Sequence, residues 1–407
     1  MSTAGTTGFA ALLADLARIG AHADAPGCTR LAWSDEDLSA RAWFAAAAEA
    51  RGLDVETDRN GNLWAWWGER DADVVVTGSH LDTVVRGGAY DGALGVVSAL
   101  SAVDALRGRG VRIGSTSLAV VAFADEEGAR FNTPTFGSGL LTGRRVAADV
   151  LGRRDAAGTS VEAALRRARV DPDGVGPDPA RLWRVTAMVE LHVEQGRHLV
   201  DAGAGVALCA GVWPRGRWRL HVDGEANHAG TTALDDRADP MLVAAAATTA
   251  ARSHAARLGC RATIGRVDVT PNAASTVPAR VTAFLDARAA DDATLDGFYT
   301  RWRSDVSAAA AHHGCAATVD LDSRGAATTF DAALVDRLAE RLGPSVPRIP
   351  TAAGHDAAVL AAQVPAAMLF VRNPTGVSHS PHEHADPSDC AAGVTALTDV
   401  LEDLIGR

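Results

Sequence analysis

The chain has 407 residues and a formal net charge of -11, and all 39 of its basic residues are arginine because the sequence contains no lysine. A Walker A loop, a Schiff-base or pyridoxal-phosphate enzyme and a Cys–Glu–Lys amidase each need a lysine, so these classes are excluded. The acidic balance argues against nucleic acid or an anionic membrane surface as a partner.

The length predicts two or three domains at about 150 residues each. No basic region precedes the first apolar stretch, and no run of about 18 apolar residues occurs, so we expect neither a signal peptide nor a membrane span. The five cysteines are scattered, odd in number and without CxxC spacing. This usage favours a reduced, cytoplasmic location over a disulfide framework.

Apolar runs over residues 74–77 and 118–124 predict strands that are buried on both faces, as in an α/β sheet. The intervening residues 92–110 predict a helix, which makes a βαβ unit and a sheet covered by helices. Residues 366–371 predict a further buried strand. Residues 144–181 are rich in turns and contain one helix, for which Thr159 and Glu162 have capping-box spacing.

The region from 214 to 325 has a different pattern. Residues 217–223 and 280–288 alternate apolar and polar side chains, which is typical of half-exposed strands. Helices are predicted over 239–259 and roughly 292–313. We therefore expect an inserted α+β domain at 214–325, within a first domain that is formed by residues 1–213 and 326–407.

Imidazoles and carboxylates follow the predicted strands. His80 and Asp91 belong to GSHLDTVVRGGAYDG, whose glycines allow close backbone approach to a ligand. Glu126 and Glu127 follow the next strand, where one carboxylate can bind a metal while its neighbour handles a proton. Each pattern alone also suits a solvated loop or helix start.

Two further histidines complete the set. His192 lies in VELHVEQG, where a core histidine is the simpler interpretation, and His379 lies in the histidine-rich GVSHSPHEHA. Together the five side chains suit two zinc-like ions that share one carboxylate. Two such ions activate water and polarise a carbonyl.

Seven motifs occur in one order: GCTRLAWSDEDLSAR, DRNGNLWA, GSHLDTVVRGGAYDGALGV, DEEGARF, ELHVEQG, NHAGTT and GVSHSPHE. Over nearly the whole chain this resembles the L-carbamoylase, allantoate amidohydrolase and β-ureidopropionase branch of the di-zinc aminoacylase-like metallopeptidases. The resemblance implies a zinc-peptidase-like catalytic domain with a mixed sheet between helices, and a smaller α+β lid and dimerisation domain. It also implies a homodimer.

The resemblance further implies two divalent metal ions per subunit, of zinc, manganese or cobalt. One ion would be held by His80 and His192 and the other by Glu127 and His379, with Asp91 bridging them. Asp82 would orient His80. Glu126 would be the general base, taking a proton from the attacking water and passing it to the leaving nitrogen.

For the substrate, the resemblance implies that Arg288 binds a carboxylate, which suits a bidentate guanidinium. Alternation supports its exposure, because Arg288 shares a strand face with Thr282 and Asp286. His228, in NHAGTT, would stabilise the tetrahedral intermediate. Gln195 and Gly354 are expected to contact substrate as well.

The chain departs from the family at substrate positions. Ser275 stands where the family's PNAxN motif usually ends in asparagine, and Arg215 stands where a glutamine is usual. The usual SGAGHDA loop is TAAGHDA at 351–357. The side chain of Ser275 is shorter than that of asparagine and extends less far. The guanidinium of Arg215, in place of a glutamine amide, could bind another acidic or carbonyl group. The metal ligands match the family while substrate recognition is altered.

The expected activity is metal-dependent hydrolysis of a linear amide-type C–N bond in a small N-carbamoyl or ureido acid, such as an N-carbamoyl-L-amino acid, allantoate or a ureidopropionate. The alternative is an N-acyl amino acid amidohydrolase or dipeptidase with the same metal site. A catalytically dead binding protein would lack a ligand or Glu126, and all are present. A serine hydrolase is not expected, because GxSxG is absent.

Overall fold

The computed structural model describes residues 4–406, which divide into two compact units. Unit 1 comprises the chain up to Ala210 and from Thr329 onward, and unit 2 comprises Gly211–Thr328. Among the described residues, no helix combines the length and the apolar character needed to cross a membrane.

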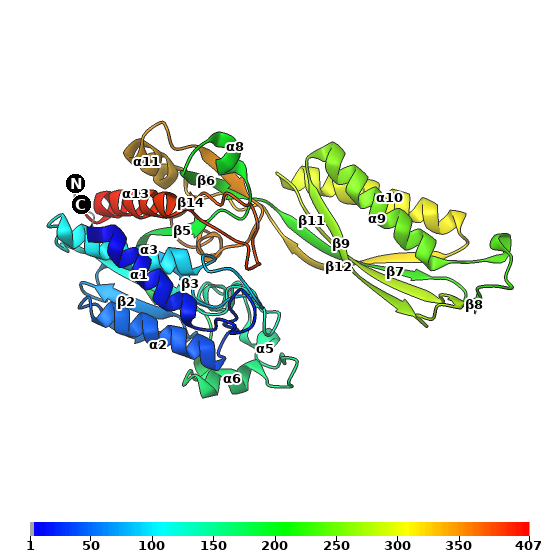
Figure 1. The fold of residues 1–407 in the computed structure, drawn as a ribbon, viewed down its shortest axis with the longest axis horizontal. Helices are drawn as coiled ribbons and strands as arrows, with labels where there is room; N and C mark the ends of the chain where they lie inside the picture. The colour runs from blue at the N-terminus through cyan, green and yellow to red at the C-terminus, as the bar shows by residue number, and fades with distance from the viewer. Residues whose placement is uncertain (1–3, 407) are drawn as a thin grey trace. The chain divides into compact units, whose positions relative to one another are not determined.

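Unit 1 is built on an eight-stranded mixed sheet with the strand order β1-β2-β4-β3-β5-β14-β6-β13 (Figure 1). β3 is parallel to β4 and β5, and β5 is parallel to β14, whereas β1, β2 and β6 pair antiparallel with their neighbours β2, β4 and β14. The strands are β1 (Asp54–Thr57), β2 (Leu63–Trp67), β3 (Asp73–His80), β4 (Thr116–Phe123), β5 (Val185–Val193), β6 (Val206–Val212), β13 (Arg348–Thr351) and β14 (Ala366–Val371).

Helices cover this sheet. Those of unit 1 are α1 (Ala4–Arg18), α2 (Asp35–Glu49), α3 (Ala93–Gly108), α4 (Phe136–Leu141), α5 (Ala147–Val150), α6 (Val161–Arg167), α7 (Pro179–Leu182), α8 (His198–Ala202), α11 (Ala332–Leu342), α12 (Asp356–Leu360) and α13 (Pro387–Ile405). α3 and α13 pack together against β3 and β5, and α12 packs against β5 and β14. The central strands are buried almost throughout, because both of their faces are covered.

Unit 2 contains a four-stranded antiparallel sheet with the order β12-β7-β11-β9 and two long helices (Figure 1). The elements are β7 (Arg215–Asp223), β9 (Arg261–Thr270), β11 (Arg280–Arg288), β12 (Ala316–Gly325), α9 (Pro240–Leu258) and α10 (Asp292–His312), with a small ladder of β8 (Asn227–His228) and β10 (Thr276–Val277). In β7 and β11, every second side chain is buried against the helices. The predicted fold class, an α/β unit plus a smaller α+β unit, is confirmed.

One helix cap was predicted wrongly. Ser160, and not Thr159, caps α6, and its hydroxyl accepts a hydrogen bond from the Ala163 amide at 3.1 Å. Glu162 therefore lies one position too early for a capping box, and it pairs with Arg166 instead. Both hydroxyl residues fit the N-cap preference, and only the backbone path decides between them.

Trp302 is expected to be a major contributor to the stability of unit 2. Its side chain is fully buried, and its indole Nε1 donates to the Ala247 carbonyl at 3.0 Å. Trp302→Ala should lower the free energy of unfolding of unit 2 by about 3–5 kcal/mol, because the substitution leaves a cavity. Trp183 is 90% exposed and provides the control. Trp183→Ala should change stability by no more than about 0.5 kcal/mol. Equal shifts of the two variants in urea unfolding would contradict this assignment.

Candidate metal centre and active site

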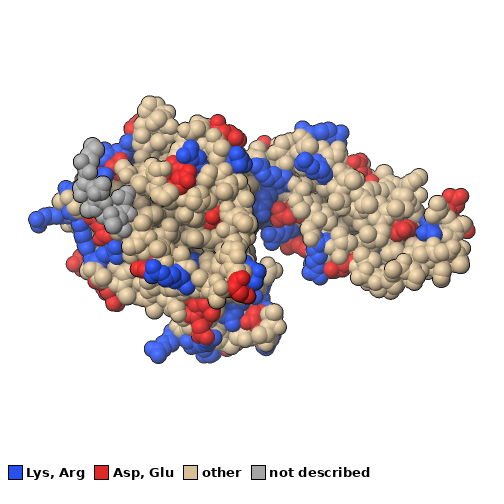
Figure 2. All heavy atoms as spheres, viewed as in Figure 1, with Lys and Arg blue, Asp and Glu red and all other residues tan. Residues whose placement is uncertain are grey.

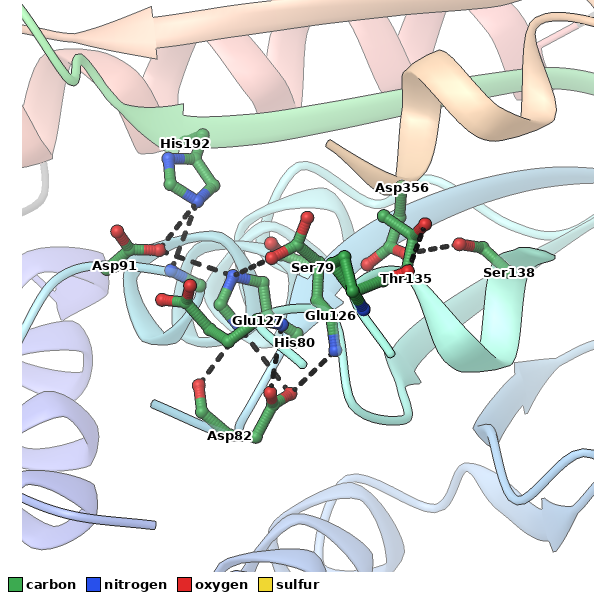
Figure 3. A network of polar contacts seen from close by, with 12 residues as sticks. Ser79, His80, Asp82, Asp91, Glu126, Glu127, Thr135, Ser138, His192 and Asp356 are labelled. Carbon is green, nitrogen blue, oxygen red and sulfur yellow. Dashed lines mark hydrogen bonds and ion pairs between the residues drawn. The ribbon is translucent and has the colours of Figure 1, made fainter. Parts of the chain in front are cut away.

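The candidate site lies at the carboxyl ends of three neighbouring parallel strands (Figure 3). His80 is the last residue of β3, Glu126 and Glu127 follow β4, and His192 is the penultimate residue of β5. Parallel strands deliver their carboxyl ends to one edge of a sheet, where α/β proteins commonly bind ligands. Asp91 reaches the same place from the loop that precedes α3.

Two imidazoles converge on one oxygen of Asp91. His80 Nε2 lies 3.3 Å and His192 Nε2 lies 3.2 Å from Asp91 Oδ1, and all three side chains are buried. Each Nδ1 contacts a main-chain oxygen instead, that of Asp82 at 3.0 Å and that of Val193 at 2.8 Å. A carbonyl can only accept, so each Nδ1 carries a proton and each Nε2 faces the carboxylate.

The second oxygen of Asp91 faces a different pair of side chains. His379 Nε2 lies 3.5 Å from Asp91 Oδ2 and 3.3 Å from Glu127 Oε2. His379 comes from the loop after β14 and is half exposed, while the Glu127 carboxylate is buried. The five residues thus form two groups, His80–Asp91–His192 and Asp91–Glu127–His379, each compact enough to hold an ion, with Asp91 in both.

The donor set fits divalent cations. The Gly92 amide donates to His192 Nε2 at 3.2 Å, so this nitrogen presents a lone pair on the side that also faces Asp91 Oδ1. Lone pairs that face one another are stabilised by a cation between them. Burial opposes protonation of His80, yet the surrounding carboxylates, Asp91 foremost, raise its pKa well above the usual value. The cluster therefore attracts positive charge, as protons or as metal.

Asp82 organises the segment that carries the two glutamates. Its carboxylate oxygens accept hydrogen bonds from the Glu126 and Glu127 amides, both at 3.1 Å. The His80 Nδ1 is closer to the Asp82 main-chain oxygen, at 3.0 Å, than to its carboxylate, at 3.6 Å. Asp82 therefore contacts the ring of His80 mainly through its backbone and the glutamate loop through its side chain.

Glu126 lies beside the two candidate ligand groups without belonging to either. Its Oε2 is 3.9 Å from His80 Nε2, and only 8% of the residue is exposed. Burial raises the pKa of its carboxyl well above the usual value, although the positive charge of His80 opposes this. A carboxylate with a raised affinity for protons beside a candidate metal site is suited to proton transfer.

Glycine is required at position 92. Its φ is +65°, and a Cβ there would lie 2.5–2.6 Å from ring atoms of His80. The loop GGAYDG thus lets the backbone pass directly over the imidazole and deliver Asp91 to it.

Glu383 is a site residue that the sequence analysis did not single out. It is buried, and its Oε2 accepts hydrogen bonds from the amides of Tyr90 and Asp91, both at 3.0 Å. Burial, followed by the charge of Asp91, raises its pKa to about 7. In the sequence, the signal for Glu383 was its position four residues after His379 in the motif GVSHSPHEHA.

Gln195 was expected to contact substrate. In the structure its side-chain amide donates to Asp91 Oδ2 at 2.7 Å.

A third group of possible ligands, Glu190, His192 and His355, also escaped the sequence analysis. Glu190 accepts from Ser79 at 2.7 Å and from the Ala357 amide at 2.8 Å, so its oxygens are used within the protein. His355 is buried, and burial followed by the charge of His192 lowers its pKa well below the usual value. Gly354 precedes it in the loop before α12. The His355 ring packs against that of His192, with the ring centroids 4.6 Å apart.

His228 and Ser275 lie in unit 2, His228 in β8 and Ser275 directly before β10. Thr276 is the register partner of His228, and the Ala229 amide donates to the Ser275 carbonyl at 2.9 Å. The His228 Nδ1 accepts from the amides of Gly230 and Thr231 at 3.0 and 3.2 Å. Because Nδ1 accepts, the proton of the neutral ring is on Nε2, so this exposed imidazole presents a donor.

Arg288 and Arg215 also lie in unit 2, opposite each other on β11 and β7. Arg288 Nε donates to Asp286 Oδ1 at 3.1 Å, and Arg217 Nε donates to Asp286 Oδ2 at 2.9 Å. Burial opposes ionisation of Asp286, but the two arginines lower its pKa overall. Asp286 thus orients Arg288 on the open face of the sheet.

Comparison with known proteins agrees with this geometry. Residues 71–403 match the model of peptidase family M20/M25/M40. The chain is 33% identical to allantoate amidohydrolase of Bacillus subtilis, over 95% of this chain and 94% of that protein. It is 35% identical to N-carbamoyl-L-amino acid amidohydrolase of Geobacillus stearothermophilus, over 91% and 92% of the two chains.

A solved structure extends the likeness to three dimensions. A hydantoinase/carbamoylase family amidase from Burkholderia ambifaria superposes with a TM-score of 0.85 at 33% identity, covering 98% of this chain and 97% of that one. The chain therefore belongs to peptidase family M20/M25/M40, in its hydantoinase/carbamoylase branch.

Proposed function

We propose that this protein is a metal-dependent amidohydrolase that cleaves a linear amide-type C–N bond in a small N-carbamoyl or ureido acid. The observation that carries the proposal is the arrangement of two histidines on one oxygen of Asp91, and of His379 with Glu127 on the other. Relatives named as allantoate and N-carbamoyl-L-amino acid amidohydrolases support the bond type.

Two divalent ions, of zinc, manganese or cobalt, are proposed to be held by His80, His192 and Asp91 and by Glu127, His379 and Asp91. When bound, such ions polarise a carbonyl and lower the pKa of water. We further propose that the enzyme acts as a cytoplasmic homodimer on a substrate that carries a carboxylate.

The protein's own groups account for the proton transfers. Glu126 takes a proton from the attacking water and delivers it to the leaving nitrogen as the C–N bond breaks. His228 donates from Nε2 to the oxygen that becomes negative. For an N-carbamoyl acid, the products are the amine and carbamic acid, which decomposes to carbon dioxide and ammonia. Allantoate-type cleavage would likewise release ammonia from a ureido group.

A substrate panel tests the proposal. Metal-loaded protein is incubated with N-carbamoyl-L-amino acids, allantoate, β-ureidopropionate, N-acyl amino acids and dipeptides, and ammonia and amine are measured. Turnover of a carbamoyl or ureido acid is expected. Turnover of only the N-acyl acids or dipeptides would instead favour an acylase or dipeptidase with the same metal site.

Arg288→Ala should impair substrates that carry a carboxylate. A charge-assisted hydrogen bond contributes about 1.5–3 kcal/mol, so kcat/KM should fall by about 10- to 100-fold. Neutral amides should be affected much less. Arg280→Ala is a matched control, because Arg280 lies at the other end of β11 and pairs with Asp223 at 2.5 Å. Equal losses on charged and neutral substrates would contradict the role of Arg288.

A further inference from the structure

Three arginines occupy one rung of the sheet in unit 2. Arg288 on β11 lies opposite Arg215 on β7 on one side and opposite Arg261 on β9 on the other. Directly opposed residues of antiparallel strands point to the same face and lie about 5 Å apart. The Arg261 guanidinium lies over the ring of Trp213, 5.3 Å from its centroid. Arg288, the proposed carboxylate-binding residue, therefore has one further arginine beside it on each of the two neighbouring strands.

Glycine provides the space for Arg215. Gly325 on β12 is the register partner of Arg215. A Cβ at this glycine would lie 3.3 Å from Cγ and 3.5 Å from Nε of Arg215. The arginine side chain thus lies across Gly325, and a Cβ at this position would pack tightly against it.

Arginines outnumber carboxylates on the two rungs at this end of the sheet. The next rung on the same face contains Arg217, Asp286, Thr263 and Ser323. The two rungs thus hold four arginines and a single carboxylate, Asp286, which Arg217 and Arg288 both contact. Basic side chains gather at this end of unit 2, where β7 begins (Figure 2). Such a surface attracts ligands with more than one negative charge.

We infer that Arg215 is a specificity-determining residue that binds a second carboxylate, so that the preferred substrate is an N-carbamoyl or ureido dicarboxylic acid. The inference rests on the proposed function. One guanidinium fork matches one carboxylate, and Arg288 and Arg215 stand side by side to take one each. A neutral side chain such as glutamine at position 215 would supply no charge. An apolar substrate side chain would desolvate Arg215 without compensation.

The test compares substrates that differ only in this charge. N-carbamoyl-L-glutamate and N-carbamoyl-L-glutamine are nearly isosteric, as are the corresponding aspartate and asparagine derivatives. For the metal-loaded enzyme, kcat/KM should favour the acidic member of a pair by about 10- to 100-fold. Arg215→Gln should remove this preference, and Arg215→Lys should retain part of it through charge alone. Arg280→Gln, which removes an arginine at the far end of β11, should keep the full preference.

Binding provides a readout that does not depend on turnover. Calorimetry should give succinate a dissociation constant at least about 10-fold lower than that of its monoamide succinamate on the metal-loaded enzyme. In the Arg215→Gln variant, the two dissociation constants should be equal.

The outcomes separate the two proposals. Equal turnover of acidic and neutral pairs, or an Arg215→Gln variant that loses the same factor on both, would overturn the second-carboxylate site and leave the proposed function standing. Turnover of none of the carbamoyl or ureido acids by metal-loaded protein would overturn the proposed function, and this inference with it.

Discussion

Glu126→Gln is expected to lower kcat by about 10²- to 10⁴-fold, which is the usual contribution of a positioned general base. The amide is nearly isosteric with the carboxylate but cannot accept a proton from water. Glu126 belongs to neither ligand group, and its Oε2 is 3.9 Å from His80 Nε2. Metal content, measured by inductively coupled plasma mass spectrometry, should therefore stay close to that of the unsubstituted enzyme.

Glu127→Gln is the matched comparison, because Glu127 is the adjacent residue and its Oε2 lies 3.3 Å from His379. This variant should lose metal as well as activity. A Glu126→Gln enzyme with near-normal kcat would remove Glu126 as the base. Equal loss of metal in both variants would show instead that Glu126 is a ligand.

Removal of metal is the second large expected effect. Dialysis against a chelator should lower kcat/KM by about 10³-fold or more, since the ions contribute several kcal/mol to the transition state. It should also lower the Tm, because ions that bind only the folded protein stabilise it. Addition of zinc, manganese or cobalt should restore both quantities.

His80→Ala offers a control for this experiment. The His80 ring lies against Asp91 and under Gly92, so its loss should reduce metal content without a chelator. The metal stoichiometry of the unsubstituted enzyme should approach two ions per subunit. Full activity after verified removal of metal would rule out the proposed mechanism.

Much of the secondary structure was predictable because its patterns are local. The apolar run 366–371 coincides with β14, and the alternation over 280–288 coincides with β11, including the exposed face that carries Arg288. The helices predicted over 239–259 and 292–313 match α9 and α10 to within one residue at each end. The period of apolar residues in a helix or strand depends on which of its faces is buried, so the sequence of apolar and polar side chains indicates that face directly.

The candidate site was predictable only in part. Motif resemblance identified His80, Asp91, Glu127, His192 and His379, and the structure brings all five together, although their roles as ligands stay predictions. Glu383, Glu190 and His355 were missed because each acts through hydrogen bonds or packing with residues distant in the chain. The one signal for Glu383 was its position four residues after His379, and spacing alone does not show that a glutamate is buried.

By itself, the sequence determined the strand and helix patterns, the set of possible metal ligands, and the restriction of every basic side chain to arginine. The tertiary structure decided which ligand faces which oxygen of Asp91, that Asp82 holds the two glutamate amides, and that Arg215, Arg288 and Arg261 share one rung. The physical reason is that periodicity depends on neighbours along the chain. Strand order and register depend instead on how distant segments pack, and only these place side chains within bonding distance.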